Sequence, residues 1–425
     1  MGENMIRVIR GNVFQSFLFA VCLVACAGAF GAKHSHPAPA DKPSTNTEIR
    51  AVWASTLSPC MNTPEEIHRL VESTRKAHLN TIIAQVRHRG IVYYKSKAEP
   101  MAPAPAKIAG FDPLATLLKE AHETSGGQQR LDVYAWFNAF ALEKIEQSSA
   151  TEKLRPWLSL TTTGSVASFL DPAIPEVQNH LLSLVEDCLR DYDIDGINLD
   201  FIRYPENDAG YHPVAIKRFH EQYGSKAKAS PDNPDWNTFR RDQVTAFVRR
   251  CHDAVLRLRP NAVISIDAIG FGGPPKKDFS DSRPYQQVHQ DWAGWLRAGY
   301  IDAVTRMGYK RESVPQQAQD FRGWADFSRQ LQDECPGRYV TLGIGGYLNT
   351  EEDTLTQYRE AQKRNLGTSL FSYWRPTRAS NQTNQYGPDS PFWEKLGTQI
   401  YPSIIGPVRP EARRIPKQES KRVPR

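Results

Sequence analysis

The chain has 425 residues, of which 40% are hydrophobic and 24% charged, and its formal net charge is +6. It contains no HExxH, no GxSxG and no phosphate-loop pattern, which argues against a zinc hydrolase, an α/β-hydrolase serine enzyme and a P-loop protein. Four cysteines lie beyond the N-terminal segment: Cys60, Cys188, Cys251 and Cys335. They show neither a CxxC pair nor metal-ligand spacing, so we expect no metal. Cys188 and Cys251 fall on apolar faces of expected helices, which favours buried thiols over bridges.

The N-terminus has the pattern of a bacterial export signal. Arg7 and Arg10 precede an apolar run over 13–25 that is too short to span a membrane. This run leads into Leu-Val-Ala-Cys at 23–26, which resembles the lipobox in which the cysteine becomes the lipidated first residue. We therefore predict a lipoprotein-type signal over 1–26, a lipid on Cys26 and anchoring to the bacterial outer membrane facing the periplasm. The alternative is ordinary cleavage near 29–32, which would leave a soluble protein.

Two polar segments flank the rest of the chain. Residues 27–47 are Pro-rich and carry nothing to bury, so we expect a disordered linker. Residues 402–425 are expected to form a basic disordered tail, because 409–425 hold seven Lys and Arg against two Glu, a local charge of +5. Such a tail could contact anionic lipid or wall polymer, but a solvated tail is the simplest interpretation. Export makes nucleic acid the least favoured partner.

Strand and helix patterns alternate eight times over 48–401. The expected strands lie near 50–56, 80–86, 131–137, 194–199, 262–267, 301–306, 338–344 and 368–373. The expected helices lie near 64–78, 113–123, 176–191, 236–259, 285–298, 315–333, 351–365 and 392–399. This alternation predicts an α/β fold, a (β/α)8 TIM barrel forming one catalytic domain. An open doubly wound sheet is the alternative, but no GxGxxG follows the first strand.

The stretch 192–205 carries the most informative charge pattern. Its apolar run is too short for a helix and is closed by Pro205, which predicts a buried parallel strand. Asp200 and Arg203 follow the C-terminal end of that strand, which is the catalytic face of a barrel, whereas Asp195 lies at its start. A carboxylate at a buried strand end is costly unless it is paired or reacting. We therefore predict functional roles for Asp200 and Arg203 and a structural one for Asp195; an ion pair without chemistry is the alternative.

Polar and aromatic side chains recur at the ends of the other expected strands. This mixture fits sugar recognition, because sugar rings stack on aromatic faces and their hydroxyl groups meet polar edges. Asp267 follows the fifth strand and supplies a second carboxylate beside Asp200. The predicted substrate-binding residues are Arg87, Trp136, Asn138, Arg203, Tyr309, Tyr347, Trp374 and Arg375.

Five segments carry a family resemblance: EIRAVW at 48–53, NTIIAQVR at 80–87, VYAWFN at 133–138, LDP at 170–172 and DGINLDF at 195–201. In this order they resemble the bacterial glycoside-hydrolase-like family 10 barrels. The resemblance implies a barrel over 48–400 and a secreted or lipoprotein hydrolase of peptidoglycan strands stripped of their stem peptides. Two departures leave the proton donor open. His88-Arg89-Gly90 replaces the usual Arg-Pro run, and no carboxylate accompanies Met307-Gly308-Tyr309.

A more distant likeness is to chitinase-type family 18 barrels, which carry Asp-Gly-x-Asp-x-Asp-x-Glu on strand four and Met-x-Tyr on strand six. The matching positions are Asp195, Gly196, Asp200, Met307 and Tyr309. Asn198 and Ile202 replace an Asp and the acidic Glu, so the substrate-assisted machinery is incomplete. A contact of Tyr309 with an N-acetyl group remains a hypothesis.

Glycoside cleavage needs one acid for the leaving oxygen and one carboxylate as nucleophile, base or stabiliser. Asp200 and Asp267 end neighbouring strands, which lie about 5 Å apart, so carboxyl separations of roughly 5 to 9 Å and either stereochemical outcome are attainable. A nearby Arg would keep one Asp ionised while burial raises the pKa of the other. For Asp267 the alternative is a structural hydrogen-bonding role. The reserve acids are Glu206, Glu99 and Glu143.

These patterns together predict a glycoside hydrolase of the cell envelope that works without a cofactor on peptide-free peptidoglycan strands. The first alternative is a non-catalytic carbohydrate-binding protein of the envelope, which the missing family-18-type Glu favours. The second is a hydrolase of another exported or environmental polysaccharide. Release of new reducing ends would distinguish a hydrolase from a binding protein.

Overall fold

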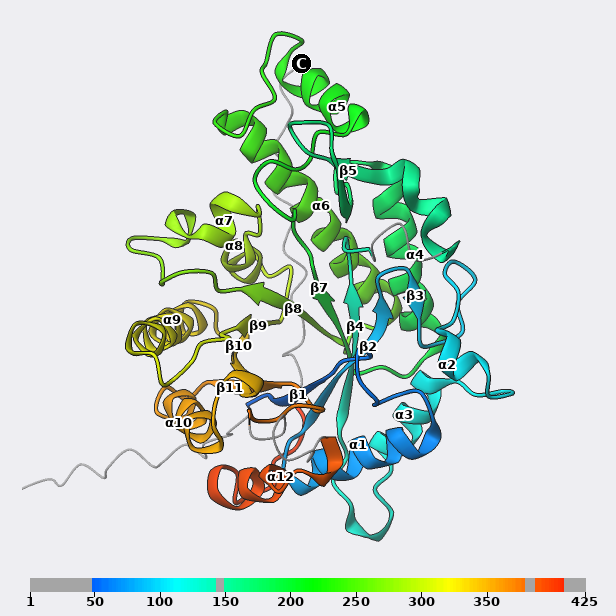
Figure 1. The fold of residues 1–425 in the computed structure, drawn as a ribbon, viewed down its shortest axis with the longest axis vertical. Coiled ribbons are helices and arrows are strands. Elements are labelled where there is room, and N and C mark those ends of the chain that lie inside the picture. Colours follow the sequence, from blue (N-terminus) through cyan, green and yellow to red (C-terminus); the bar gives the residue numbers. More distant parts are fainter. Residues whose placement is uncertain (1–47, 143–148, 379–386, 409–425) are drawn as a thin grey trace, which may run out of the picture. The chain divides into compact units, whose positions relative to one another are not determined.

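Eight parallel strands close into a barrel at the centre of the computed structural model (Figure 1). They are β1 (Arg50–Ala54), β2 (Thr81–His88), β4 (Asp132–Asn138), β7 (Gly196–Asp200), β8 (Val263–Ile269), β9 (Ala303–Met307), β10 (Tyr339–Gly345) and β11 (Gly367–Phe371). Each strand pairs with the next in this order, and β1 also pairs with β11, which closes the ring. The predicted (β/α)8 barrel is therefore confirmed.

The structure describes residues 48–142, 149–378 and 387–408. Several predictions from the sequence lie outside these ranges. They are the signal over 1–26 with Cys26, the linker over 27–47, the basic segment over 409–425 and the reserve acid Glu143.

Helices surround the barrel, and their first turns explain where they begin. In α1 the side chain of Thr63 accepts a hydrogen bond from the Glu66 backbone N–H, and Pro64 occupies a position whose N–H would have no helical partner. Asp112 caps α3 in the same way. The helices are α1 (Pro64–Lys76), α2 (Pro103–Ala106), α3 (Pro113–His122), α4 (Pro175–Asp191), α5 (Pro213–Tyr223), α6 (Pro234–Leu258), α7 (Arg283–Gln287), α8 (Trp292–Arg297), α9 (Pro315–Glu334), α10 (Glu351–Gln362) and α12 (Phe392–Lys395).

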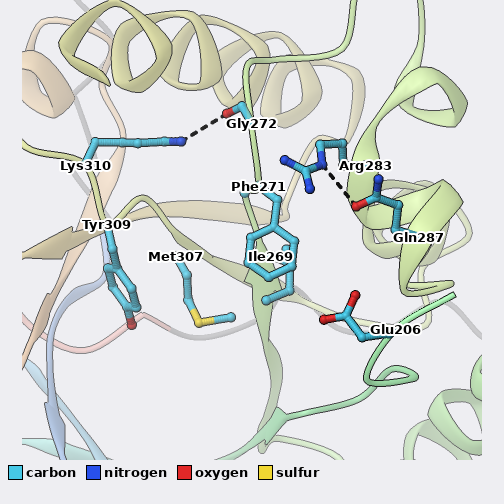
Figure 2. Close-up of a pocket in the computed structure, with 10 residues that line it drawn as sticks. Glu206, Ile269, Phe271, Gly272, Arg283, Gln287, Met307, Tyr309 and Lys310 are labelled. Atoms are coloured by element: carbon cyan, nitrogen blue, oxygen red, sulfur yellow. Dashed lines mark hydrogen bonds between the residues drawn. The ribbon is translucent and has the colours of Figure 1, made fainter. Parts of the chain in front are cut away.

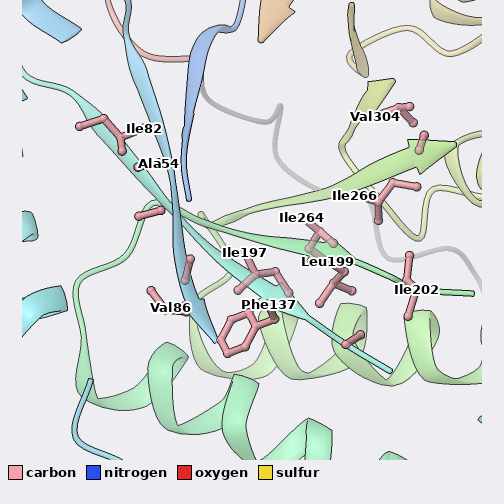
Figure 3. Close-up of a cluster of buried hydrophobic side chains, with 14 of the residues drawn as sticks. Ala54, Ile82, Val86, Phe137, Ile197, Leu199, Ile202, Ile264, Ile266 and Val304 are labelled. Carbon is pink, nitrogen blue, oxygen red and sulfur yellow. The ribbon is translucent and has the colours of Figure 1, made fainter. Parts of the chain in front are cut away.

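The outer faces of the strands form the larger apolar layer. Ile197 and Leu199 of β7 and Ile264 and Ile266 of β8 belong to one buried cluster with side chains of the surrounding helices (Figure 3). The inner faces are buried as well. Strands covered on both faces have mostly apolar sequences, which is why the run before Asp200 was recognisable as a strand.

A second apolar cluster fills the inside of the barrel, with Trp53 and Tyr134 as its largest fully buried members. Gly196 makes room for one of these rings. A Cβ built on Gly196 would lie 2.8 Å from Cδ1 of Tyr134, closer than real side chains approach. The glycine at the start of β7 therefore allows a tyrosine from the neighbouring strand to cross the barrel interior.

The helix expected over 285–298 is instead two short helices, α7 and α8. The backbone between them turns through His289, whose φ is +57°. Gln290 explains the break, because its amide group binds the end of β8. It accepts a hydrogen bond from Ile269 N at 2.8 Å and donates one to Asp267 O at 3.1 Å. The segment that interrupts the helix thus holds the strand that carries Asp267.

Three features between the expected elements were not predicted. An antiparallel hairpin of β5 (Leu158–Leu160) and β6 (Val166–Leu170) precedes α4, and α5 follows β7. A two-residue strand, β3 (Ile91–Val92), pairs antiparallel with β2. These strands are short and partly exposed, so they lack the long apolar pattern that identifies a barrel strand.

The tail boundary predicted at residue 402 is wrong, because residues 402–408 pack against the barrel. Val408 is 1% exposed and belongs to the apolar cluster inside the barrel. Backbone carbonyls of the same segment accept hydrogen bonds from Arg50 and Asn80. The basic charge of the tail suggested a solvated chain, whereas burial of Val408 holds residues 402–408 against the barrel.

The prediction of buried thiols at Cys188 and Cys251 is confirmed, and Cys60 and Cys335 are free and buried as well. Within the described ranges no helix is both long and apolar enough to cross a membrane. Among the same residues no group of three or more His, Cys, Asp and Glu side chains is arranged to hold a metal ion.

Candidate functional site

Two adjoining cavities lie at the carboxyl ends of the barrel strands. The carboxylate cavity has a volume of about 300 Å³ and is lined by both Asp200 and Asp267. The cationic cavity has a volume of about 410 Å³ and is lined by Arg283 and Lys310 (Figure 2). The two cavities are adjacent, because four residues line both: Ile269, Phe271, Met307 and Tyr309.

Asp200 ends β7 and is only 7% exposed. Its Oδ2 accepts a hydrogen bond from Trp136 Nε1 at 3.2 Å, and its Oδ1 accepts one from the Phe201 backbone N–H at 2.7 Å. Burial raises the pKa of Asp200 to about 6, although these hydrogen bonds and the charges of Arg203 and Arg89 oppose the rise. Asp200 therefore changes its charge near neutral pH.

Asp267 lies on β8, the neighbouring strand, and is 1% exposed. It accepts hydrogen bonds from Trp53 Nε1 at 3.2 Å and from Asn198 Nδ2 at 3.1 Å. Gly343 leaves room for the tryptophan, because a Cβ there would lie 3.0 Å from Trp53 Cη2. Burial, reinforced by the charge of Asp200, raises the pKa of Asp267 well above its usual range. This shift favours the protonated form of Asp267.

The two aspartates thus lie in one cavity with different electrostatic surroundings. A protonated carboxyl group can donate a proton, and an ionised one can attack or stabilise positive charge. This division of roles is what glycoside cleavage requires. One carboxyl group can therefore act as the acid and the other as nucleophile or base, and this chemistry needs no bound cofactor.

Trp136 and Asn138, both predicted to bind substrate, line the carboxylate cavity from β4. Asn138 pairs in register with Asp200, and its side-chain oxygen accepts a hydrogen bond from Gln85 Nε2 at 3.1 Å. Tyr309 also lines this cavity, and its ring contacts the rings of Trp53 and Phe371. The cavity therefore combines an amide with an aromatic wall.

Arg203 lines the same cavity as Asp200, as the sequence predicted. Its Nη1 donates hydrogen bonds to the backbone oxygens of Tyr204 at 3.0 Å and Pro205 at 3.3 Å, so it acts on Asp200 by charge rather than by direct contact. Burial lowers the pKa of Arg203, and the charge of Asp200 opposes that shift.

The structure does not place Arg87 in either cavity. Its guanidinium group is fully buried, bonds both carboxylate oxygens of Glu99 at 2.7 and 2.8 Å, and donates to the backbone oxygens of Asn138 and Ala139. An irregularity in the β2–β4 register falls between Gln85 and Arg87. This bulge re-aims Arg87 away from the inward face that simple alternation predicts.

Three further predicted binding residues line neither cavity. Tyr347 packs behind Tyr309 and Phe371, with ring centroids 6.2 and 5.9 Å away. Trp374 contacts the helical side of the fold, where it lies against Gly387. Arg375 is exposed in the loop after β11. Tyr347 therefore supports the aromatic wall, whereas Trp374 and Arg375 lie outside the site.

The reserve acids Glu99 and Glu206 have different environments. Burial would raise the pKa of Glu99, but the charge of Arg87 and hydrogen bonds from His180 and Arg87 outweigh it and lower the pKa to about 2. A carboxyl group held ionised in this way cannot serve as a proton donor. Glu206, in contrast, lines the cationic cavity and points into it (Figure 2).

Asp195 lies at the opposite end of β7, as expected for a structural residue. It accepts hydrogen bonds from His122 Nε2 at 2.8 Å, Arg130 Nη2 at 2.6 Å and the Val133 backbone N–H at 2.9 Å. Burial alone would raise the pKa of Asp195, but these partners lower it. They join the start of β7 to β4 and α3.

Other residues of the carboxylate cavity were not among the predicted site residues. Burial, and then the charges of Arg89 and Arg87, lower the pKa of His88 to about 4, so it is neutral there. The departure from the family pattern at 88–90 was the signal for His88 and Arg89. The remaining unpredicted lining residues are Trp53, Ser55, Leu57, Gln85, Phe201, Ile269, Phe271, Met307 and Phe371. Trp53 lies inside a strand, where no sequence pattern separates cavity from core.

Comparison with known proteins places the sequence in one family. The family model described as glycosyl hydrolase-like 10 matches residues 48–345. The glycosyl hydrolase YngK of Bacillus subtilis is 25% identical over 334 residues, covering 72% of this chain and 60% of that protein. The glycosyl hydrolase DigH of Escherichia coli K12 is 23% identical, covering 68% of this chain and 73% of that protein. The chain thus spans less than two thirds of the length of the B. subtilis relative.

Solved structures share the fold at low sequence identity. The glycoside hydrolase domain of PgaB (BpsB) from Bordetella bronchiseptica has a TM-score of 0.60 and 13% identity, with coverage of 83% of this chain and 99% of that one. A β-galactosidase from G. stearothermophilus has a TM-score of 0.58 and 8% identity, with coverage of 84% and 57%. Both are barrels named for glycoside hydrolysis, and at these identities the likeness concerns the fold.

Proposed function

The chain belongs to the glycosyl hydrolase-like 10 family, and from that premise we propose that it hydrolyses glycosidic bonds with Asp200 and Asp267 as the reacting carboxyl groups. The observation that carries this proposal is the pair itself. Two buried carboxyl groups on neighbouring strands line one cavity, and their surroundings give them different pKa values. Pairs separated in this way take the acid and base roles in glycosidases.

In the proposed reaction protonated Asp267 donates its proton to the glycosidic oxygen as the bond from that oxygen to the anomeric carbon breaks. Ionised Asp200 faces the positive charge that develops on the sugar and acts as nucleophile, base or stabiliser. Water then supplies the new hydroxyl group at the anomeric carbon, and its second proton restores Asp267. Trp136 orients Asp200 through its Nε1–H, and Tyr309 and Phe371 form an apolar wall for the sugar.

The proposed substrate is peptidoglycan from which the stem peptides have been removed. The support is the sequence resemblance over five segments, the aromatic and amide lining of the cavity, and the export pattern at the N-terminus. We further propose that lipid on Cys26 holds the protein at the outer membrane facing the periplasm, where this polymer is present. Another exported polysaccharide is the second candidate.

The test is to incubate the purified protein with peptide-free glycan strands and with neutral oligomers of N-acetylglucosamine. We expect new reducing ends from the peptide-free strands. Glycan binding without release of reducing ends would instead support the non-catalytic carbohydrate-binding protein. Asp200→Asn is the matched control, because a reaction that persists at full rate in this variant does not use the proposed site.

A further inference from the structure

The cationic cavity has no part in the reaction described above, yet it opens from the same space. Phe271 and Tyr309 line both cavities, and Phe271 is 41% exposed between them. A sugar bound beside Asp200 and Asp267 therefore has its neighbour along the strand at the cationic cavity. The residues that line the cationic cavity therefore influence which neighbouring sugar the protein accepts.

Two cationic side chains meet around Gly272 at one side of the cavity (Figure 2). Lys310 Nζ donates a hydrogen bond to Gly272 O at 3.1 Å, and Arg283 packs on Gly272, with its Cδ 3.1 Å from the place of a Cβ. Trp324 Nε1 donates to the same carbonyl at 3.1 Å, so the loop is held in place. The φ of +67° at Gly272 is one that a residue with a side chain rarely adopts.

Both cations retain donors for a ligand. In the described part of the chain Arg283 donates only through Nε, to Gln287 at 3.0 Å, which leaves both of its Nη groups available. Lys310 has three N–H groups and uses one on Gly272 at hydrogen-bonding distance. Its nearest carboxylate, Asp320, is 3.8 Å away.

A third cation lies beneath the cavity floor. Arg306 is fully buried, and none of its guanidinium nitrogens has a hydrogen-bond partner among the described residues. A Cβ on Gly270, which lines the cavity, would lie 3.1 Å from Arg306 Nη1. Burial lowers the pKa of Arg306 to about 9, so it remains charged near neutral pH. The ring centroids of Phe321 and Trp324 lie 5.6 and 5.8 Å from its Cζ. A buried cation that makes no hydrogen bond is still costly, and an anion in the adjoining cavity would offset part of that cost.

The surrounding acids do not neutralise this group. The cations of this group are Lys310, Arg283 and Arg306. The acids near them are Asp320, which lies beside Lys310, and Glu206, which lies across the cavity. Figure 2 shows Lys310 and Arg283 at the Gly272 side of the cavity and Glu206 at the opposite side. With three cations and one carboxylate, the Gly272 side has a net charge of +2, part of which an anionic group would balance.

From this arrangement we propose that the cationic cavity is a subsite for a sugar carrying a free carboxylate, held by Lys310 and Arg283. The proposal rests on the proposed function and names the substrate feature that the site reads. In a peptidoglycan strand every second sugar carries a lactyl ether, whose carboxyl group is free only where no peptide is attached. A peptide converts it to a neutral, bulky amide, which loses the charge that the cations recognise. The subsite would thus select strands without peptides.

The experiment compares peptide-free strands with the same strands after their carboxyl groups have been capped as methylamides. We expect kcat/KM to be about tenfold or more higher on the free carboxylates, the range that hydrogen bonds to charged groups give. Lys310→Met and Arg283→Gln should each lower the rate on free strands and leave the rate on capped strands near that of the parent. Equal rates of the parent on both substrates would overturn the proposal.

Lys277→Met is the matched control, because Lys277 is exposed on the same loop and does not line the cavity. It should leave the preference for free carboxylates unchanged. Lys310 also holds the loop, so its variant can lose structure; exposed Arg283 then provides the test, with melting temperature measured for each variant. Inhibition by an oligouronate would extend the subsite to any sugar carboxylate, and absence of inhibition would restrict it to the lactyl ether.

Binding separates failure of this subsite from failure of the proposed function. Titration of the protein with free and capped strand fragments needs no turnover. If no glycan is cleaved but free fragments bind about tenfold tighter than capped ones, the subsite stands and the hydrolase proposal fails. If strands are cleaved and the two fragments bind equally, the hydrolase stands and the subsite fails.

Discussion

Asp200 and Asp267 lie on neighbouring strands, but they are solvated differently. Asp200 accepts a backbone N–H and a tryptophan N–H at the cavity and feels two arginines, whereas Asp267 lies deeper, with a tryptophan and an asparagine as its donors. Burial raises the pKa of both carboxyl groups; the charges of two arginines oppose this rise at Asp200, whereas the charge of Asp200 reinforces it at Asp267. The proposed division of roles therefore depends on neighbours rather than on the residue type.

Asp200→Asn keeps the size of the side chain and removes its charge. We expect turnover to decrease on the order of a hundredfold or more, because a positioned charge at the reacting carbon is lost. Melting temperature should not decrease. The comparison variant is Asp195→Asn, which loses charge-assisted hydrogen bonds to His122 and Arg130 and should reduce the free energy of unfolding by about 2 kcal/mol or more while the folded fraction stays active. If Asp200→Asn instead loses stability and Asp195→Asn loses turnover, then Asp195 is the functional residue and Asp200 the structural one.

The raised pKa of Asp200 also links pH to stability. Folded Asp200 titrates near about 6, above its usual value of 3.8, so the folded state binds its proton more tightly than the unfolded state. Its favourable contribution is complete below pH about 4 and is lost as pH increases through about 6, a change on the order of 3 kcal/mol. Asp200→Asn should therefore become more stable relative to the parent across this interval in denaturation curves. A constant difference would contradict the shift.

The same titration should appear in activity. We expect kcat/KM to increase with pH through about 6 as Asp200 ionises, and to decrease at higher pH as Asp267 loses its proton. Glu206→Gln is the control for the high-pH limb, since Glu206 is the other carboxyl group at the site. Loss of that limb in this variant, with its retention in Asp267→Asn, would make Glu206 the proton donor.

At the scale of the elements, the bulge in β2 decides the role of its last residues. It moves Arg87 beside Phe137, a member of the outer apolar layer, where Glu99 and His180 meet it. One extra residue in a strand reverses the alternation that otherwise assigns side chains to the inside or outside. The family-like Arg87 is therefore part of the support of the site and not of its lining.

Glu99→Gln tests that support. The substitution leaves Arg87 buried without its ionic partner, so the free energy of unfolding should decrease by about 3 kcal/mol, as for other broken buried pairs. Activity of the folded fraction should persist. Urea denaturation and turnover measured on the same sample distinguish the two effects. If the variant is as stable as the parent but loses most of its turnover, Glu99 is a catalytic acid and not a structural one.

At the scale of the whole molecule, the end of the described chain closes the bottom of the barrel. Truncation after Val408 should leave melting temperature unchanged, whereas truncation after Tyr401 removes a valine buried inside the barrel and should cost about 2 kcal/mol or more. The two truncations differ by seven residues and share the loss of the basic segment. Equal melting temperatures would mean that residues 402–408 add no stability.

Attachment to the membrane is the other prediction at this scale. Cys26→Ser removes the thiol that the proposed lipid would modify, so the protein should move from the membrane fraction to the soluble periplasmic fraction. Immunoblots of separated fractions measure this change. Cys60→Ser is a suitable control, because Cys60 is a buried thiol of the barrel. A Cys26→Ser protein that fractionates like the parent would exclude lipid at this position.

The amino-acid sequence by itself determined the barrel, the order of its strands and the strand ends that carry Asp200 and Asp267. These features follow from apolar periodicity and helix caps, which act between residues close together in the chain. Only the tertiary structure decided that Arg87 turns away, that Val408 fills the barrel and that cations gather beside the reacting pair. Such features depend on contacts between distant residues: Trp53 and Asp267, whose hydrogen bond helps to position the predicted acid, are 214 positions apart. No local sequence pattern encodes a contact between residues so far apart in the chain. The electrostatic environment of the site could therefore be inferred only from the closed barrel.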